Sequence, residues 1–326
     1  MAQHAGVSVG TVSNVLNSRG VVSDKTRKKV QASIKALAFS SNMLARGMRG
    51  QRFPVVGLCL PYGISSNFMS LADSLEQRAV NSNYELLQVY TRHSSQLELA
   101  RVQQLIASRV SGAILVPTQQ HQRVLQLLHD SKMPTVLINS IGNDTTQFDR
   151  VQVNFRDAHR KAATRLIETG HRLIILVSQF PNFAVIQENI AGVREAIAES
   201  DEDVQLVVHK CDTDRASLTG ALSELMKAQK GRVALIASSS RLSAWAYITF
   251  RELGLKCPED ISLLSTEEPD WAEAAWPTLS AIQQPTREIS RLTWDLLSTR
   301  MSGEDSARAF VQCEARINFR GSIAEG

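Results

Sequence analysis

The chain has 326 residues, of which 43% are hydrophobic and 21% are charged, a composition typical of a globular protein with two or three domains. No apolar run approaches the roughly 20 residues that cross a bilayer, and the N-terminus lacks the residue succession of a signal peptide. These features argue against disorder, membrane insertion and secretion. We therefore expect a cytoplasmic protein.

Positive charge is concentrated at the N-terminal end of the sequence. Residues 1–52 contain nine Lys or Arg and one acidic residue, Asp24, whereas the other 274 residues contain 27 basic and 31 acidic ones. A segment of net charge +8 therefore precedes a body of net charge −4. A polyphosphate is the natural partner of such a segment, although a solvated basic bundle without nucleic acid would carry the same charge.

Short helices are predicted within this basic segment. One runs from Ser8, its N-cap, to about Asn17, and Gly6 suits a tight turn before it. Its inward stripe consists of Val12, Val15 and Leu16. A following helix starts at the cap Ser23, exposes its basic residues, and is expected to bury Val30, Ile34 and Leu37. Residues 42–49 form two further turns only if DNA or a partner orders them.

The order of residues in this segment resembles the DNA-binding headpiece of the lactose-repressor family of bacterial transcription regulators. The matching residues are Ala5-Gly6-Val7-Ser8, Thr11-Val12-Ser13, Val15-Leu16-Asn17, Val22-Ser23, Thr26-Arg27, Val30, Asn42 and Ala45-Arg46. The resemblance implies a helix-turn-helix whose recognition helix enters the major groove of DNA.

The resemblance also implies roles for individual residues. The base-reading positions are Val9, Gly10 and Asn14, of which only Asn14 has a hydrogen-bonding side chain, suited to an adenine edge. The phosphate-contacting positions are Ser8, Thr11, Ser13, Asn17, Ser23 and Thr26. The DNA contacts implied in the hinge segment are Asn42, Ala45, Met48 and Arg49, with Met48 as the apolar wedge in the minor groove.

The segment departs from the family pattern at its start. Only four residues precede Ala5, so about one turn of the first helix is expected, whereas the family's first helix begins well upstream. A start codon upstream of Met1 would explain this. The alternative is a small-molecule receptor with impaired or no DNA binding.

The remaining chain alternates short aliphatic runs with helical stretches, which predicts parallel sheets built from β-α-β crossovers. The expected strands are residues 55–60, 85–90, 112–116, 134–139, 173–177, 204–209, 233–237 and 261–264. Helices are expected between them, for example at 71–81, 96–108 and 157–169. This number of strands exceeds one compact lobe, so we expect two doubly wound lobes with a ligand cleft at the carboxyl ends of the strands.

Motifs for catalysis, cofactors and metals are absent from this body. The sequence has no glycine-rich dinucleotide fingerprint, no phosphate-binding loop and no Gly-x-Ser-x-Gly elbow, and its histidines are isolated. Cys59, Cys211, Cys257 and Cys313 lie far apart and are expected to be reduced, mostly buried thiols. We therefore expect no enzyme, no cofactor and no metal site.

The resemblance to the lactose-repressor family extends through the body. The matching stretches are Gly170-His171-Arg172, Arg251 to Leu255, Pro258 to Ser262, and Pro277, Leu279-Ser280, Ile282 and Gln284-Pro285. They imply an effector-binding core resembling periplasmic sugar-binding proteins of type I. The implied domains are a headpiece with hinge at 1–50 and a core at 51–326. The implied lobes are 54–153 with 284–303, and 154–283 with 304–326, joined near Val153, Gln283 and Ser302.

Positions that line the effector site in sugar-responsive relatives are altered here. The candidate effector-binding residues are Phe68, Asn154, Phe155, Asn189, Ser239, Ser240 and Glu268. Asn189 stands where relatives have a clamping Arg, and Glu268 stands for a customary Asp. The loss of charged groups and the presence of Phe68 and Phe155 favour a less hydroxylated or aromatic ligand, unless the two Phe are ordinary core residues.

The implied function is a transcription regulator, chiefly a repressor. A homodimer is expected because the family's tetramerising C-terminal helix is missing, and its partners are a palindromic double-stranded DNA operator and a small-molecule effector. The effector would open or close the two lobes and so set the spacing of two headpieces. The effector's identity, its inducing or corepressing action and the operator sequence are left open.

Replacing Met48 with Ser is expected to weaken binding to a specific operator far more than binding to random DNA. The wedge and the bend it permits are lost, while the phosphate contacts survive. Fluorescence anisotropy with both DNAs at one salt concentration measures the two affinities. Equal losses on both would argue against the wedge.

Overall fold

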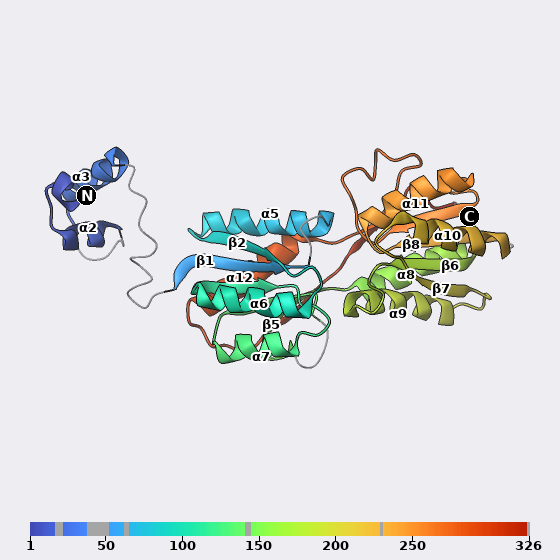
Figure 1. Cartoon of the computed structure of the whole chain (residues 1–326), viewed down its shortest axis with the longest axis horizontal. Coiled ribbons are helices and arrows are strands. Elements are labelled where there is room, and N and C mark those ends of the chain that lie inside the picture. Colours follow the sequence, from blue (N-terminus) through green and yellow to red (C-terminus); the bar gives the residue numbers. More distant parts are fainter. Residues whose placement is uncertain (17–21, 38–51, 62–64, 141–144, 229–230, 325–326) are drawn as a thin grey trace. The chain divides into compact units, whose positions relative to one another are not determined.

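The structure is a computed structural model that describes residues 1–16, 22–37, 52–61, 65–140, 145–228 and 231–324 (Figure 1). The chain forms two compact units, Met1–Phe53 and Pro54–Gly326. In the described part, no helix combines the length and the apolar character needed to cross a membrane.

The N-terminal unit contains the helices α1 (Ala2–Ala5), α2 (Val9–Leu16) and α3 (Asp24–Ala36). Its small core consists of Ala5, Val12, Val15 and Val30, with Met1, Ala2, Val7, Val22 and Ile34 packed around it. Gly6 ends α1 in the left-handed conformation at φ 64°, which a residue without Cβ adopts readily.

The prediction that Leu37 is buried is wrong. α3 ends at Ala36, so Leu37 lies beyond the helical stripe and its surface is 45% exposed. Ser33, one turn before, lies on the inward face instead, where it donates to the carbonyl of Lys29 and contacts His4 Nδ1 at 3.0 Å.

The first sheet of the C-terminal unit has the strand order β11-β5-β4-β3-β1-β2. Its strands are β1 (Phe53–Leu60), β2 (Glu85–Tyr90), β3 (Val110–Leu115), β4 (Thr135–Ile138), β5 (Asp149–Val153) and β11 (Phe310–Cys313). The ladders β1–β2, β3–β4, β4–β5 and β5–β11 are parallel. The helices α5 (Ser66–Asn81) and α12 (Thr286–Met301) cover one face, and α6 (Ser95–Ala107) and α7 (Gln122–Asp130) cover the other (Figure 1).

The second sheet has the order β12-β10-β9-β8-β6-β7. Its strands are β6 (His171–Ser178), β7 (Gln205–Lys210), β8 (Arg232–Ala237), β9 (Ile261–Ser265), β10 (Ser280–Gln283) and β12 (Arg316–Asn318). All ladders are parallel except β10–β12. The helices α8 (Phe155–Glu168) and α9 (Ala184–Ala198) pack on one face, and α10 (Arg215–Ala228) and α11 (Ser240–Leu253) pack on the other.

All eight predicted strands are present, and each aliphatic run lies in a sheet covered by helices on both faces. Four further strands, β5, β10, β11 and β12, were not predicted because they are short and hold polar or charged residues. Three of the four cysteines are buried and all four are free thiols, as predicted.

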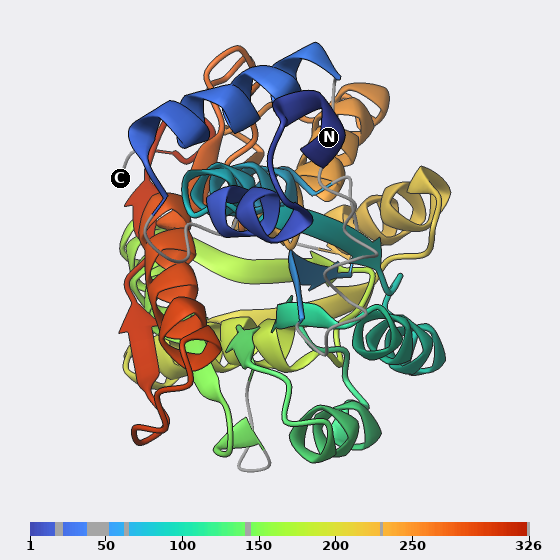
Figure 2. The same cartoon turned by 90° about the vertical axis from the view of Figure 1, so that its left-hand side faces the viewer.

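The chain passes between the two sheets three times: after β5, after β10, and between β11 and β12. The expectation that residues 304–326 belong wholly to the second lobe is wrong, because β11 pairs with β5 in the first sheet. The third passage therefore lies between Cys313 and Arg316, beyond the expected position near Ser302. Figure 2 shows α12 standing beside β11, both toward the red end of the colour scale.

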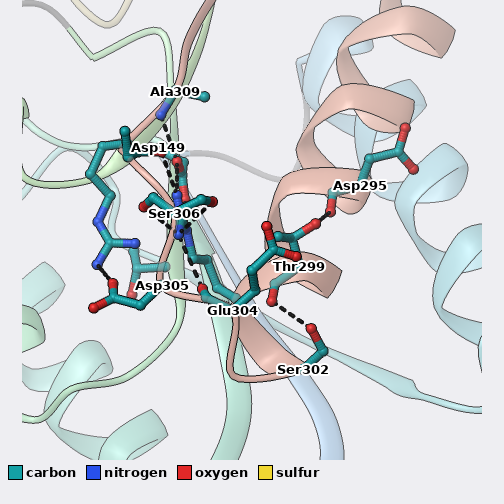
Figure 3. Close-up of polar contacts among 12 residues, drawn as sticks. Asp149, Asp295, Thr299, Ser302, Glu304, Asp305, Ser306 and Ala309 are labelled. Carbon is teal, nitrogen blue, oxygen red and sulfur yellow. Dashed lines mark hydrogen bonds and ion pairs between the residues drawn. The ribbon is translucent and has the colours of Figure 1, made fainter.

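An ion pair between Asp149 and Arg300 holds the segment between α12 and β11 against the first sheet. Asp149 opens β5 and is 1% exposed, and its two carboxylate oxygens accept from Arg300 Nε at 2.6 Å and Nη2 at 2.9 Å. The Ala309 N–H donates to the same carboxylate at 2.8 Å (Figure 3). Arg300 also donates to the carbonyls of Glu304, Ser306 and Ala307, so one guanidinium fixes the loop that leads into β11.

Burial acts to raise the pKa of Asp149, but the hydrogen bonds from Arg300 and Ala309 and the charge of Arg300 outweigh it. The pKa consequently lies below its ordinary value. The carboxylate contributes stability above the pKa of an unfolded Asp, and this contribution is lost as pH falls through the lowered folded pKa.

Replacing Arg300 with Met should lower the free energy of unfolding by about 3–5 kcal/mol at pH 7, because the buried charge of Asp149 loses its cationic partner and keeps only the bond from the Ala309 N–H. The control is Arg291→Met on the same helix, which removes an exposed pair with Asp295 and should cost less than about 1 kcal/mol. Denaturant unfolding of both variants measures the difference. Similar losses in the two variants would contradict the importance of the buried pair.

Candidate functional sites

The outer face of α2 carries the residues expected to read DNA bases. Val9 is 75% exposed, and Gly10 and Asn14 are also exposed. Val12 and Val15, on the opposite side, are buried in the core of the unit. The helix is thus held by its apolar face and presents one amide side chain beside apolar and small groups.

The N-termini of α2 and α3 have the same cap. Ser8 Oγ accepts from the Thr11 N–H at 3.0 Å, and Ser23 Oγ accepts from the Thr26 N–H at 3.4 Å. In each cap the two hydroxyls are 2.9 Å apart. Helix N-termini expose backbone N–H groups and positive dipole ends, so both are suited to bind phosphate.

The cationic residues Lys25, Lys28 and Lys29 lie exposed on α3. Thr11, Ser13 and Thr26 are half-buried, whereas Ser8 and Ser23 are exposed. The expected contacts Asn17, Asn42, Ala45, Met48 and Arg49 lie outside the described residues.

A cavity of about 570 Å³ lies in the C-terminal unit, where the carboxyl ends of the strands of both sheets meet. Its lining includes residues just after nearly every strand: Pro61, His93, Val116, Thr118, Asn139, Phe155, Ser178, Phe180, Ser238, Ser239, Thr266, Glu267 and Gln284. The cavity is therefore bounded by both lobes.

Aromatic rings form much of the cavity wall. The rings of Phe180 and Phe183 are stacked with centroids 5.1 Å apart, and His93 packs against them at 4.3 and 4.5 Å. Phe68 and Phe155 also line the cavity, although both pack against the hydrophobic core as well. Burial lowers the pKa of His93 to about 4, so its imidazole is neutral near pH 7.

The cavity lining contains four of the seven residues expected to bind an effector: Phe68, Phe155, Asn189 and Ser239. Asn154 lines an adjoining hollow of about 200 Å³, accepts from the Asp157 N–H and donates to Glu314. Ser240 lies beside the cavity, where its hydroxyl accepts from Ser66 at 3.4 Å.

Glu268 pairs with Arg320 and accepts from Asn318 at 2.8 Å. Its neighbour Glu267 lines the cavity instead. Glu267 Oε1 accepts from Ser65 Oγ at 2.8 Å, and Oε2 accepts from the Ser240 N–H at 3.0 Å. Adjacent side chains point in different directions, so Glu267 faces the cavity and Glu268 does not. The sequence showed only that two glutamates stand side by side at this point, not which of them would face the cavity.

Asn189 is buried on α9, with 2% of its surface exposed, and lines the cavity. Its Oδ1 atom has no hydrogen-bond partner. An unpaired buried amide oxygen costs about 1–3 kcal/mol, so this position favours a ligand that donates a hydrogen bond.

Polar contacts join the two lobes around the cavity. Besides the bond between Ser65 and Glu267, Gln119 donates to the carbonyl of Asn182 at 3.0 Å. The two lobes are thus in direct contact beside the cavity that both of them line.

A buried carboxylate supports the cavity wall from behind. Glu98 on α6 has no exposed surface and accepts from the N–H and the hydroxyl of Thr118 at 2.8 and 2.6 Å. His121 Nδ1 lies 2.6 Å from the Thr118 carbonyl. Burial raises the pKa of Glu98, and the bonds from Thr118 and the nearby His121 only partly oppose it.

Among the described residues, no cluster of His, Cys, Asp or Glu is arranged to hold a metal ion.

Comparison with known proteins identifies both units. Residues 1–42 match the family model described as bacterial regulatory proteins, lacI family. Residues 163–323 match the model of a periplasmic binding protein-like domain.

Curated relatives match over nearly their whole length. Catabolite control protein A of Priestia megaterium is 26% identical over 324 residues, covering 99% of this chain and 97% of the relative. The HTH-type transcriptional repressor PurR of Vibrio campbellii is 25% identical over 329 residues, covering 99% and 97%.

Solved structures share the fold. The Lac repressor dimer bound to operator and the anti-inducer ONPF has a TM-score of 0.86 at 20% identity, covering 99% of this chain and 98% of that one. The transcriptional regulator CelR–cellobiose complex has a TM-score of 0.72 at 25% identity, covering 98% of each chain.

Glu98→Gln should stabilise the protein increasingly as pH rises from 4.5 to 8. A glutamine keeps the acceptor for the Thr118 N–H, but it cannot ionise inside the protein. Because the folded pKa of Glu98 is raised, the wild type loses stability as pH rises above the unfolded value, by about 1.4 kcal/mol for each unit of pKa shift. Denaturant unfolding across this pH range measures both proteins, and parallel stability curves would contradict the prediction.

Proposed function

Since the chain belongs to the lactose-repressor family of bacterial regulatory proteins, we propose that it is a transcriptional repressor controlled by a small molecule bound between its lobes. It is not an enzyme, because its relatives are transcription regulators. The observation that carries the proposal is the union, in one chain, of a basic helix-turn-helix unit with a two-lobed unit that encloses a cavity.

The headpiece would bind DNA through α2 in the major groove. The exposed Val9, Gly10 and Asn14 supply the base-reading face, and the capped N-termini at Ser8 and Ser23 supply phosphate contacts. Asn17 and the hinge residues Asn42, Ala45, Met48 and Arg49 would extend this surface. A protein that occupies an operator in this way can repress by blocking access to the DNA, and this mode of repression needs no activity beyond DNA binding.

The functional unit is a homodimer on a palindromic operator in the cytoplasm. One headpiece reads only a few base pairs, and two related by a twofold axis read an inverted repeat with the specificity that a genome demands. The Lac repressor similar in fold is a dimer bound to operator.

The effector would act by changing the balance between open and closed lobes. A ligand in the cavity touches residues of both lobes, such as Phe68 from the first and Asn189 from the second, so it binds the closed form more tightly. This differential affinity is the free energy available to alter DNA binding.

Selection from a random DNA library with the full chain tests the DNA-binding role. We expect an inverted repeat bound at nanomolar concentration in physiological salt. Enrichment of no sequence, or of a single unrepeated site, would contradict the proposal.

On the selected operator, Asn14→Ala should weaken binding by about 1–3 kcal/mol and relax the preference at one base pair in each half-site. The control Lys28→Ala should weaken selected and random DNA alike, because it removes only a phosphate interaction. Anisotropy titrations with single-base operator variants give both results. An unchanged base preference in Asn14→Ala would show that Asn14 does not read a base.

A further inference from the structure

The cavity lining has few charged residues. Among its described lining residues there is no Lys or Arg, and Glu267 is the one carboxylate. The other titratable lining residues are His93, which is neutral near pH 7, and His121, whose Nδ1 is directed to the Thr118 carbonyl. Phosphate or carboxylate ligands would therefore find no Lys or Arg to pair with.

Glu267 keeps free capacity for a ligand. Each of its oxygens accepts one hydrogen bond, from Ser65 Oγ and from the Ser240 N–H, and a carboxylate oxygen can accept two. No Lys or Arg in the described part of the chain forms an ion pair with it, whereas the adjacent Glu268 is neutralised by Arg320. The cavity thus holds a carboxylate without a cationic partner.

Asn189 gives an independent indication of a donor on the ligand. Its buried Oδ1 has no partner in the protein, so a ligand N–H would remove an unpaired acceptor. Two hydrogen-bond acceptors, the carboxylate of Glu267 and the amide oxygen of Asn189, therefore belong to the same cavity.

The aromatic wall suits a flat cation. The stacked rings of Phe180 and Phe183, together with Phe68 and Phe155, offer apolar surface for a ring. Aromatic faces also attract a cation within about 6 Å of a ring centroid.

We propose that the effector is a protonated amine with a flat apolar body. The amine is held by Glu267, its body lies against the phenylalanine rings, and Asn189 accepts from a second N–H. This assignment rests on the proposed control of the protein by a ligand in the cavity.

The test uses the full chain and three indole probes of matched size and different charge: tryptamine, tryptophol and indole-3-acetate. Isothermal titration should give the order amine, alcohol, acid. In Glu267→Gln the amine should lose about tenfold or more in affinity, because a charge-assisted bond becomes a neutral one, while the alcohol changes about twofold at most. The glutamine oxygen can still accept from the Ser240 N–H, and its NH2 group can donate to Ser65 Oγ, so both contacts are kept although the bond to Ser65 reverses its direction.

Glu268→Gln is the matched control, since it changes the neighbouring carboxylate that pairs with Arg320, and the amine preference should persist. Asn189→Leu should weaken tryptamine and remove any effect specific to the second N–H. No binding by the three probes, equal binding, or preference for the acid would overturn the proposal. Tight binding of glucose or cellobiose that Asn189→Leu abolishes would also overturn it, yet leave the regulator role intact, which the DNA selection tests separately.

Discussion

A parallel sheet places the carboxyl ends of all its strands on one edge, and the site depends on this constraint. Two sheets turn these edges toward each other, so residues following strands in both lobes meet in one cavity. The helices that cover the faces bury the aliphatic runs and leave only the edges for polar chemistry. The cavity wall is therefore complete only when both lobes contribute to it.

Three carboxylates in this unit show how differently one fold can treat a negative charge. Asp149 is matched by Arg300 and its pKa is lowered, so it fastens the edge of the first sheet. Glu98 has hydrogen bonds but insufficient positive charge, and its pKa is raised by burial. Glu267 faces the cavity with only hydroxyl and amide donors. The groups that surround each carboxylate thus distinguish the two acids buried within the fold from the one that faces the cavity.

Periodicity and aliphatic runs were enough to predict the layered α/β architecture and the strands of both sheet centres, because those strands are buried on both faces. The strands at the far ends of the chain's sheets, such as β11, were harder to assign. β11 was assigned to the wrong lobe, since the ion pair that returns it to the first sheet joins residues 151 positions apart. In the cavity, Phe68, Phe155 and Asn189 were identified from the sequence, whereas Phe180, Phe183 and His93 were not. Choosing Glu267 over Glu268 required the turn geometry after β9. Leu37 was misplaced because nothing in its helical spacing marks where α3 ends.

The tight spacing of β11 and β12 limits how the lobes can move. Only Glu314 and Ala315 separate the last residue paired in the first sheet from the first residue of β12 in the second. The three Cα–Cα steps from Cys313 to Arg316 span at most about 11 Å even when extended, so the lobes have little room to translate apart. Opening must instead be a rotation about an axis close to these peptides, with the dihedral changes confined there and at the two other passages. Such a hinge converts a small change at the cavity mouth into a larger swing at the far ends of the lobes.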